Sequence, residues 1–439
     1  MTPEGQVPLP DATSGMILLL IFLVPFAIAG LSLINTGLNR SRSAAHSIVA
    51  SLSVASVALL SYFVCGFSWQ RLSTEAGHVI GLAGKGWNWI GAGPWFLRGL
   101  AFDGSPGSLI ALLQMFSVSL AAMIPLGAGG ERWRLGASCA STALLAGWTY
   151  PLFAHWVWSG GWLAQLGQNF GLGSGFTDPG GASCIQMVGG LTALSIAWIL
   201  GARRGRFTTE GIPSAMPGHN AVLVLFGCML ALVGWIGLNS AGAILFAGLK
   251  PAQSVLIAVN TTLCSAPAAL ASLLTTRLRF GKPDASLTAN GWVAGLAASS
   301  AVCAFVKPAE AVVVGLVAGA MVVFAIEIIE LRMHVDDPAG AISVHGLGGL
   351  WGVLALGIFG QVPIGQPNGG SGQFLAQLVG VATLIGFVLP LSYGLNWLLN
   401  KFLRQRVTPE GERQGMDLFE LGAGAYPDFV THREDLLRH

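Results

Sequence analysis

The chain has 439 residues, of which 53% are hydrophobic and only 10% are charged, whereas a soluble domain carries about 25% charged residues. The composition also includes 61 glycines and 14 tryptophans, as expected for helices that pack closely in lipid and carry aromatic anchors at its surfaces. The high apolar and low charged content indicates a polytopic membrane protein in contact with a lipid bilayer. Twenty-two basic residues against 20 acidic ones are too balanced to indicate a nucleic-acid partner.

Eleven apolar segments are long enough to cross a bilayer, which takes about 20 residues. In chain order they lie at residues 16–34, 44–69, 107–129, 135–157, 181–201, 220–246, 251–275, 286–305, 309–331, 340–360 and 373–400. The first segment has no basic residues before it and no clear small-residue cleavage site after it, so we predict a retained span. The sequence therefore predicts an all-α membrane domain over residues 1–400 and a polar tail over residues 401–439.

The basic residues indicate the orientation of these spans. If the N-terminus lies outside, 17 of the 22 lysines and arginines fall on the inner side and five on the outer side. This bias follows the positive-inside rule. We expect a multi-pass protein of the cell (inner) membrane with its N-terminus outside and its C-terminal tail in the cytoplasm.

Two spans begin with similar sequences. Asp178-Pro-Gly-Gly-Ala-Ser-Cys-Ile-Gln186-Met-Val-Gly-Gly-Leu aligns with Asp337-Pro-Ala-Gly-Ala-Ile-Ser-Val-His345-Gly-Leu-Gly-Gly-Leu. The first copy opens span five from outside and the second opens span ten from inside. This arrangement predicts an inverted repeat of five plus five spans with an eleventh left over.

Gln186 and His345 occupy equivalent positions in the two copies, each eight residues past its aspartate. At about 1.5 Å per helical residue, Gln186 lies roughly 12 Å below the outer surface and His345 roughly 12 Å below the inner surface. In a core about 30 Å thick, about 6 Å of depth separates them. We therefore expect them to be neighbours near the midplane, where inverted repeats place substrate sites. The alternative is a hydrogen bond between helices that only stabilises packing. Asp178 and Asp337 are predicted to cap the helices that follow them.

Five motifs in this order resemble the ammonium transporter (Amt/Mep/Rh) family, and the resemblance covers nearly the whole chain, from about residue 16 to 428. They are Ala154-His-Trp-Val-Trp-Ser-Gly-Gly-Trp162, Gly218-His-Asn-Ala-Val-Leu-Val-Leu, Gly234-Trp-Ile-Gly-Leu-Asn239, Asn290-Gly-Trp-Val-Ala-Gly-Leu and the segment from Asp336 to Trp351-Gly. The resemblance implies a homotrimer with one pore through each protomer. It also implies ammonium or a similar small solute as the substrate.

Several positions depart from the pattern of that family. The family lines its pore with two histidines; His345 matches the second, whereas Gln186 replaces the first. A carboxamide cannot take up a proton and pass it on, so we predict a hydrogen-bonding station with at most half of a proton relay.

The outer pore also departs from the family pattern. The two stacked phenylalanines of the family gate correspond to Ser117, next to Phe116, and to Leu238. Trp158 matches the tryptophan of the outer ammonium site, but the hydroxyl position of that site falls at Gly242, near Ser240. We therefore expect a weaker ammonium site.

The tail has also changed, because Asp417-Leu-Phe-Glu-Leu-Gly-Ala-Gly-Ala-Tyr426 lacks the histidine and glutamate of the family motif. That change argues against a contact with a PII-type regulator.

Three hypotheses follow from these features. The leading one is a channel or transporter for ammonium or methylammonium with altered relay and gate residues. The alternatives are a channel for another small amine or neutral solute, and a receptor that binds ammonium without passing it. The chain shows no nucleotide loop, metal-ligand cluster or nucleophile motif, so we predict no enzyme activity, no catalytic residues, no metal and no cofactor.

Overall fold

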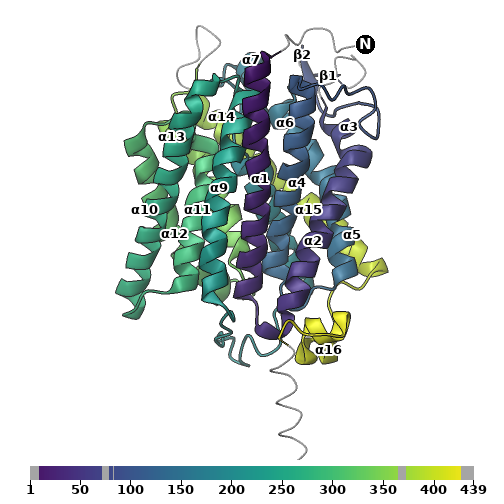
Figure 1. Cartoon of the computed structure of the whole chain (residues 1–439), viewed down its shortest axis with the longest axis vertical. Helices are drawn as coiled ribbons and strands as arrows, with labels where there is room; N and C mark the ends of the chain where they lie inside the picture. Colours follow the sequence, from purple (N-terminus) through teal and green to yellow (C-terminus); the bar gives the residue numbers. More distant parts are fainter. Residues whose placement is uncertain (1–8, 72–78, 83, 364–371, 427–439) are drawn as a thin grey trace, which may run out of the picture.

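The computed structural model describes residues 9–71, 79–82, 84–363 and 372–426. Residues 1–8 and 427–439, which include the end of the predicted tail, lie outside the described residues, as do 72–78, 83 and 364–371. The described chain forms a bundle of long helices whose long axes run in similar directions (Figure 1).

The first half of the chain supplies helices that match predicted spans one to five, with short helices between them. Their bounds are α1 (Asp11–Leu38), η1 (Ser41–Ser43), α2 (Ala44–Ser61), η2 (Tyr62–Gly66), α3 (Phe67–Gln70), α4 (Pro106–Gly129), α5 (Leu135–Leu144), η4 (Leu145–Thr149), α6 (Tyr150–Trp158), α7 (Leu166–Phe170), η5 (Ala182–Met187) and α8 (Val188–Leu200).

The second half supplies the helices of spans six to eleven and the tail. Their bounds are α9 (Ala221–Ala247), η6 (Pro251–Gln253), α10 (Ser254–Phe280), α11 (Ala285–Val302), α12 (Pro308–Leu331), η7 (Ile342–Leu347), α13 (Gly348–Phe359), α14 (Gln373–Thr383), η8 (Leu384–Val388), α15 (Leu389–Phe402), α16 (Pro409–Gln414) and η9 (Asp417–Leu421).

Nine of these helical stretches, counted within the described ranges, are long and apolar enough to cross a membrane. The two other predicted spans correspond to the continuous stretch α5-η4-α6 and to α11. In α11, 13 of 18 residues are buried inside the protein, including Asn290, Ser299 and Ser300. A helix enclosed by other helices does not need a lipid-compatible surface, so its lower hydropathy is consistent with a place in an eleven-span bundle.

The outer loop departs from the all-α prediction. Val79–Leu82 (β1) and Lys85–Asn88 (β2) pair as an antiparallel hairpin, with Val79 opposite Asn88. The chain turns at Gly84, whose φ of +73° is readily adopted by glycine. The hairpin lies outside the helical bundle, so the all-α prediction is correct for the membrane domain only.

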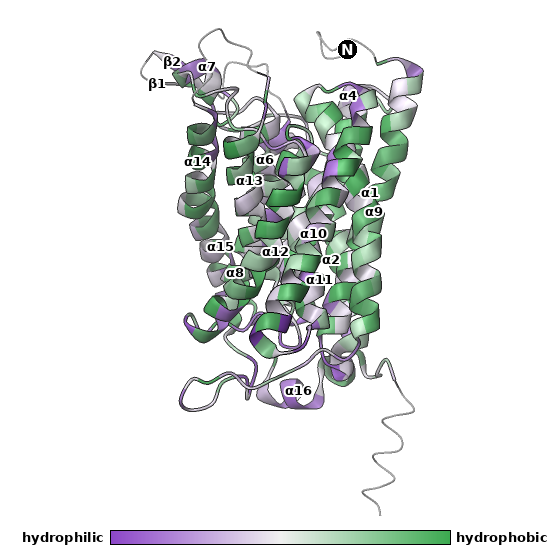
Figure 2. Ribbon diagram, turned by 90° about the vertical axis from the view of Figure 1, so that its left-hand side faces the viewer, coloured by the Kyte–Doolittle hydropathy of each residue, from purple (hydrophilic) through white to green (hydrophobic). Residues whose placement is uncertain are grey.

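The two ends of the bundle are chemically distinct from its middle. Figure 2 shows hydrophobic colour along the helices and more hydrophilic colour at α16 and around the connecting loops. The hairpin lies at the end where α1 begins, and α16 lies at the opposite end (Figure 1). An odd number of crossings gives this arrangement, as the span prediction requires.

Candidate functional site

The two repeat copies meet at the predicted central pair. Gln186 lies in η5 and His345 lies in η7, and both of these short segments are π-helical. The His345 Nδ1–H donates to Gln186 Oε1 at 2.7 Å, and both side chains are buried. The prediction that these residues are neighbours is confirmed.

Glycines allow the two copies to cross this closely. A Cβ atom on Gly190 would lie 2.4 Å from the backbone nitrogen of Gly346, and one on Gly349 would lie 2.5 Å from the carbonyl oxygen of Ala182. Gly190 and Gly349 are equivalent positions of the repeat, and each contacts the start of the other copy. The crossing is therefore close to twofold symmetric, as an inverted repeat requires.

The hydrogen-bonding capacity of the pair follows from its geometry. Because Gln186 Oε1 can only accept, the imidazole of His345 carries its proton on Nδ1, and in the neutral ring Nε2 is left as an acceptor. The amide nitrogen Nε2 of Gln186 is buried and finds no hydrogen-bond partner among the described residues, and the same is true of the Ser343 hydroxyl. The pair therefore offers one free donor and one free acceptor.

The two aspartates cap their helices as predicted. Asp178 Oδ1 accepts from the amides of Gly181 and Ala182 at 2.9 and 2.8 Å, while Oδ2 accepts from the amide and the hydroxyl of Ser183 at 2.7 and 2.5 Å. The amide of Cys184 also donates to Oδ2, at 3.2 Å. Both oxygens of Asp178 are thus engaged by the helix start.

Asp337 has fewer partners: within the described residues, its carboxylate accepts from the amides of Ala341 and Ile342, at 3.0 and 2.7 Å. Burial raises the pKa of Asp337 to about 6, although these two amides act in the opposite direction. The inner cap is therefore less well compensated than the outer one.

Trp158 ends α6 beside the outer copy of the repeat. Its indole Nε1–H donates to the carbonyl oxygen of Asp178 at 2.6 Å. Asp178 therefore contributes to the outer site by holding a helix start and an indole, while its carboxylate oxygens are used inside the protein.

Leu238 and Gly242 lie on the face of α9 that contacts this region. A Cβ atom at Gly242 would lie 2.3 Å from the carbonyl oxygen of Pro179, so no side chain with a hydroxyl fits at this position. Ser240 is two residues away, about 200° around the helix, so it does not replace the missing hydroxyl on that face. Its own hydroxyl is buried without a hydrogen-bond partner among the described residues.

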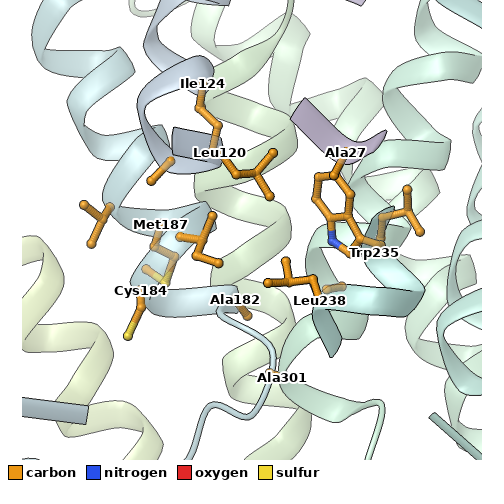
Figure 3. Packing of buried hydrophobic residues seen from close by; sticks show 14 of the residues in the cluster. Ala27, Leu120, Ile124, Ala182, Cys184, Met187, Trp235, Leu238 and Ala301 are labelled. Carbon is orange, nitrogen blue, oxygen red and sulfur yellow. The ribbon is translucent and has the colours of Figure 1, made fainter. Parts of the chain in front are cut away.

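The other two predicted gate residues lie on α4. The Ser117 hydroxyl is buried and donates to the carbonyl oxygen of Leu113, one turn earlier, at 2.8 Å, while Phe116 is partly buried against the core. Figure 3 shows Leu238 of α9 and Ala182 of η5 in one buried cluster that also contains Trp235 and Met187. Apolar packing therefore fills the region between the outer site and the central pair.

Sequence reasoning missed Phe246 at the outer end of α9. Its ring stacks on the Trp158 indole, with 4.6 Å between ring centroids and an angle of 10° between the planes. Phe246 lies four residues after Gly242 and eight after Leu238, so the helical spacing from these two positions was the signal that could have found it.

An ionic cluster that the sequence did not predict precedes the inner copy. Asp336 accepts two hydrogen bonds from the Arg203 guanidinium, at 2.9 and 3.0 Å, and one from the Arg203 amide at 2.8 Å. Arg132 lies 3.7 Å away, and Arg203 also pairs with Glu131 at 2.6 Å. Burial alone would raise the pKa of Asp336, but Arg132 and Arg203 outweigh it and lower the pKa to about 2. The doubled Asp336-Asp337 and the arginine-rich inner loops were the available signals.

The described part of the tail folds back on the same end of the bundle. Asp417 accepts from the amides of Ala45 and His46 at the start of α2, at 3.1 and 2.7 Å. Glu420 pairs with the imidazole of His46 at 2.9 Å. The altered tail motif is therefore used in contacts within its own chain.

Comparisons with known proteins agree with this architecture. The model of the Ammonium Transporter Family matches residues 15–426. The chain is 34% identical to "Ammonium transporter Amt2" of Archaeoglobus fulgidus over 429 residues, covering 94% of this chain and 88% of the relative. It is 30% identical to "Ammonium transporter 1 member 3" of Solanum lycopersicum, covering 97% of this chain and 95% of the relative.

Two solved structures have a similar fold. The "Sensor Amt Protein" superposes with a TM-score of 0.84 at 28% identity and covers 93% of this chain and 98% of its own. Mep2 of Candida albicans superposes with a TM-score of 0.78 at 24% identity, covering 92% of this chain and 88% of its own.

Proposed function

Because the chain belongs to the Ammonium Transporter Family, we propose that it moves ammonium or methylammonium across the membrane through a pore in each protomer that passes Gln186 and His345. Membership in a family of transporters agrees with the prediction that the protein is not an enzyme. The single observation that carries the proposal is the buried Gln186–His345 hydrogen bond at the crossing of the two repeat copies.

The free groups of this pair suit a neutral amine. Neutral ammonia has a lone pair for the Gln186 Nε2–H and N–H donors for His345 Nε2, whereas ammonium has donors only. The pair therefore favours the neutral form at the midplane, where an arriving ammonium ion would transfer its proton to Nε2 of His345. Gln186 cannot accept that proton, so the relay ends at His345.

Other residues of the proposed pore have supporting roles. Trp158 presents an aromatic face at the outer end, where Asp178 holds it in place. We assign Ser117, Phe116, Leu238 and Gly242 to the wall between this end and the centre, whereas Ser240 lies on another face of α9. On the inner side, a cavity lined by Arg206, Glu330, Asp337 and Ser343 serves as the proposed exit, and Ser343 precedes His345 by two residues in η7.

The test uses purified protein in proteoliposomes on a solid-supported membrane, pulsed with ammonium, methylammonium and larger amines. We expect a small ammonium current in the parent, a larger one in Gln186→His, and none in His345→Ala. Gln361→His in an outer loop and His334→Ala at the inner end are matched controls that should leave the current unchanged. An unchanged current in His345→Ala would show that the pore does not pass this pair.

Two other functions give different results in the same experiment. The similarity to the "Sensor Amt Protein" supports a receptor, which would bind ammonium and pass none. A channel for another small amine or neutral solute would pass that solute and neither bind nor pass ammonium. Ammonium binding by isothermal titration calorimetry on the same variants separates these two cases.

We propose that the protein lies in the cell (inner) membrane, with its N-terminus outside and the 401–439 tail in the cytoplasm. Single-cysteine variants at Lys85 and Arg404 test it with a membrane-impermeant thiol reagent. The reagent should reach position 85 in intact cells and position 404 only after permeabilisation. Labelling of position 404 in intact cells would show that the proposed orientation is wrong.

The proposed assembly is a homotrimer with one pore in each protomer. Native mass spectrometry in mild detergent should show a threefold species, and a monomer at all concentrations would contradict it. We propose no PII-type contact, because Asp417 and Glu420 of the altered tail motif are bound to the start of α2 in the same chain.

A further inference from the structure

The outer end of the proposed pore is closed by an aromatic contact. Phe246 stacks nearly parallel on Trp158, and 4.6 Å between the ring centroids leaves no room for a cation between them. A stacked ring occupies one of the two faces of an indole. The face covered by Phe246 is therefore not free to hold a cation by its π electrons.

The backbone around this contact holds Trp158 and brings α9 close enough for Phe246 to reach it. The Trp158 indole nitrogen donates to the carbonyl oxygen of Asp178, and Asp178 is itself held by the start of η5. Gly242 brings α9 against Pro179, the residue that follows Asp178. One turn further along the same face, α9 places Phe246 over Trp158. The close approach at Gly242 therefore determines the stack.

The position of Phe246 along α9 relates it to the missing gate. Phe246 lies eight residues, or about 12 Å along the helix axis, beyond Leu238 towards the outer end of α9. Leu238 and Ser117 carry no aromatic ring, whereas Trp158 and Phe246 form a complete aromatic pair. Both rings of that pair are partly exposed, so Phe246 has room to turn away on the outer side.

We propose that Phe246 is the outer gate of this protein and determines its selectivity among small ammonium cations. In the closed state it covers the Trp158 face; when it turns away, a primary ammonium ion takes its place on that face. The gate thus lies outside the Trp158 site, and a cation that binds this face of the indole must displace the Phe246 ring from it. This inference rests on the proposed transport function for its substrate class, but the closure itself does not.

The competition predicts how removal of the ring affects transport. Phe246→Ala frees the indole face, so the half-saturating ammonium concentration should fall roughly two- to thirty-fold, the range of one cation–π contact. The wider opening should also raise the current carried by ethylammonium relative to ammonium. Phe246→Leu keeps apolar bulk without a flat ring and should give a smaller change in the same direction. Phe246→Tyr keeps the stack and should behave like the parent.

A second measurement tests the gate through the accessibility of a thiol below the stack, and it does not require transport. In a background with the six native cysteines changed to alanine, Leu238→Cys places a thiol below the stack. A membrane-impermeant methanethiosulfonate reagent with a quaternary ammonium group, added from outside, should label this thiol faster with Phe246→Ala than without it. Phe387→Leu is the matched control, because Phe387 is a partly exposed ring that contacts Trp156 of the same helix α6, with 5.0 Å between centroids. It should leave labelling and transport unchanged.

The outcomes separate the gate from the transport proposal. Faster labelling with Phe246→Ala and no current in any variant would support the gate and reject transport. Normal currents with identical labelling rates and half-saturating concentrations in the parent, Phe246→Ala and Phe246→Leu would overturn the gate and leave transport standing. Equal effects of Phe246→Ala and Phe387→Leu would also overturn it, because any lost ring would then have the same consequence.

Discussion

The two copies of the inverted repeat have similar backbones at the crossing but are anchored by different chemistry. In the outer copy, Thr177 precedes the aspartate cap, and the Gln377 side chain holds it through its backbone, with bonds of 3.0 Å to the nitrogen and 2.9 Å to the carbonyl oxygen. In the inner copy, the equivalent residue is Asp336, whose carboxylate is held by Arg203 and lies near Arg132. One anchor is neutral and the other is ionic.

The difference follows the distribution of charge between the two ends of the bundle. Arginines collect at the end that carries α16, the proposed inner end, and Arg132 and Arg203 are buried there, so each needs an acidic or carbonyl partner. The outer end has few basic residues, and an amide from α14 makes the equivalent connection without charge. Similar helix starts can therefore be supported by whichever polar groups the topology leaves at each end. The four predictions below test whether the two anchors differ in strength as well as in chemistry.

The largest effect is expected at the ionic anchor. Asp336→Asn removes the charge that pairs with Arg203 and leaves a buried guanidinium with only Glu131 as a charged partner, which typically costs about 3–5 kcal/mol. The thermal unfolding midpoint in detergent should fall clearly. Thr177→Val, at the equivalent position of the outer copy, is the matched control, because Gln377 binds the backbone of that residue. Equal losses in the two variants would remove the distinction between the anchors.

The next largest effect is expected in the pH dependence of stability, which Asp337 should control. Its pKa is about 6 in the folded protein against an ordinary 3.8, so the folded protein binds this proton more tightly than the unfolded chain does. The stabilising contribution is full below about pH 4 and is lost as the pH rises through 6, by roughly 3 kcal/mol in total. Asp337→Asn should remove this decline in unfolding midpoints measured from pH 4 to 7.5.

Asp336→Asn serves as the comparison, because the pKa of Asp336 is shifted in the opposite direction to that of Asp337. The pKa of Asp336 is lowered to about 2, so its contribution is lost only as the pH falls towards 2. Between pH 4 and 7.5 this variant should lower the midpoint at every pH and keep most of the decline, because burial is the largest cause of the raised pKa of Asp337 and the Asp336 charge is a smaller one. If Asp337→Asn keeps the parent slope, Asp337 does not titrate in this range.

The glycines at the crossing should show where the two copies are equal. Gly190→Ala and Gly349→Ala each place a methyl group against backbone atoms of the other copy, and overpacking of this kind costs about 1–3 kcal/mol. The two variants should lower the unfolding midpoint by similar amounts. Gly386→Ala, where a Cβ meets no atom within 4 Å, is the control. A large loss in one variant alone would show that the crossing is not symmetric.

The smallest effect is expected at the neutral anchor. Gln377→Ala removes two hydrogen bonds to the Thr177 backbone, worth about 1 kcal/mol each, and no charge is left unpaired. Thr177 is only half-buried, so water can reach its freed backbone groups. The unfolding midpoint should fall by less than in Asp336→Asn. Leu375→Ala, an exposed position on the same helix, is the control. A loss in Gln377→Ala as large as that in Asp336→Asn would contradict the ranking.

The sequence by itself determined the features that depend on local composition and spacing. Apolar segment length predicted the spans, and the aligned motifs predicted both the aspartate caps and the contact between Gln186 and His345. Equal offsets of eight residues from helix starts at opposite surfaces place the two side chains only about 6 Å apart in depth in a core about 30 Å thick, so the repeat was enough to predict that contact.

Only the tertiary structure decided which distant residues meet. Phe246 is 88 positions from Trp158 in the chain, and Asp336 is 133 positions from Arg203. Such pairings depend on how α6 and α9, or the loops after α8 and α12, approach one another, and periodicity describes a helix face without identifying the helix opposite. The missing hydroxyl at Gly242 shows the same limit. The substitution was visible in the sequence, but its physical reason, the carbonyl oxygen of Pro179 lying where a Cβ would stand, exists only in the packed structure.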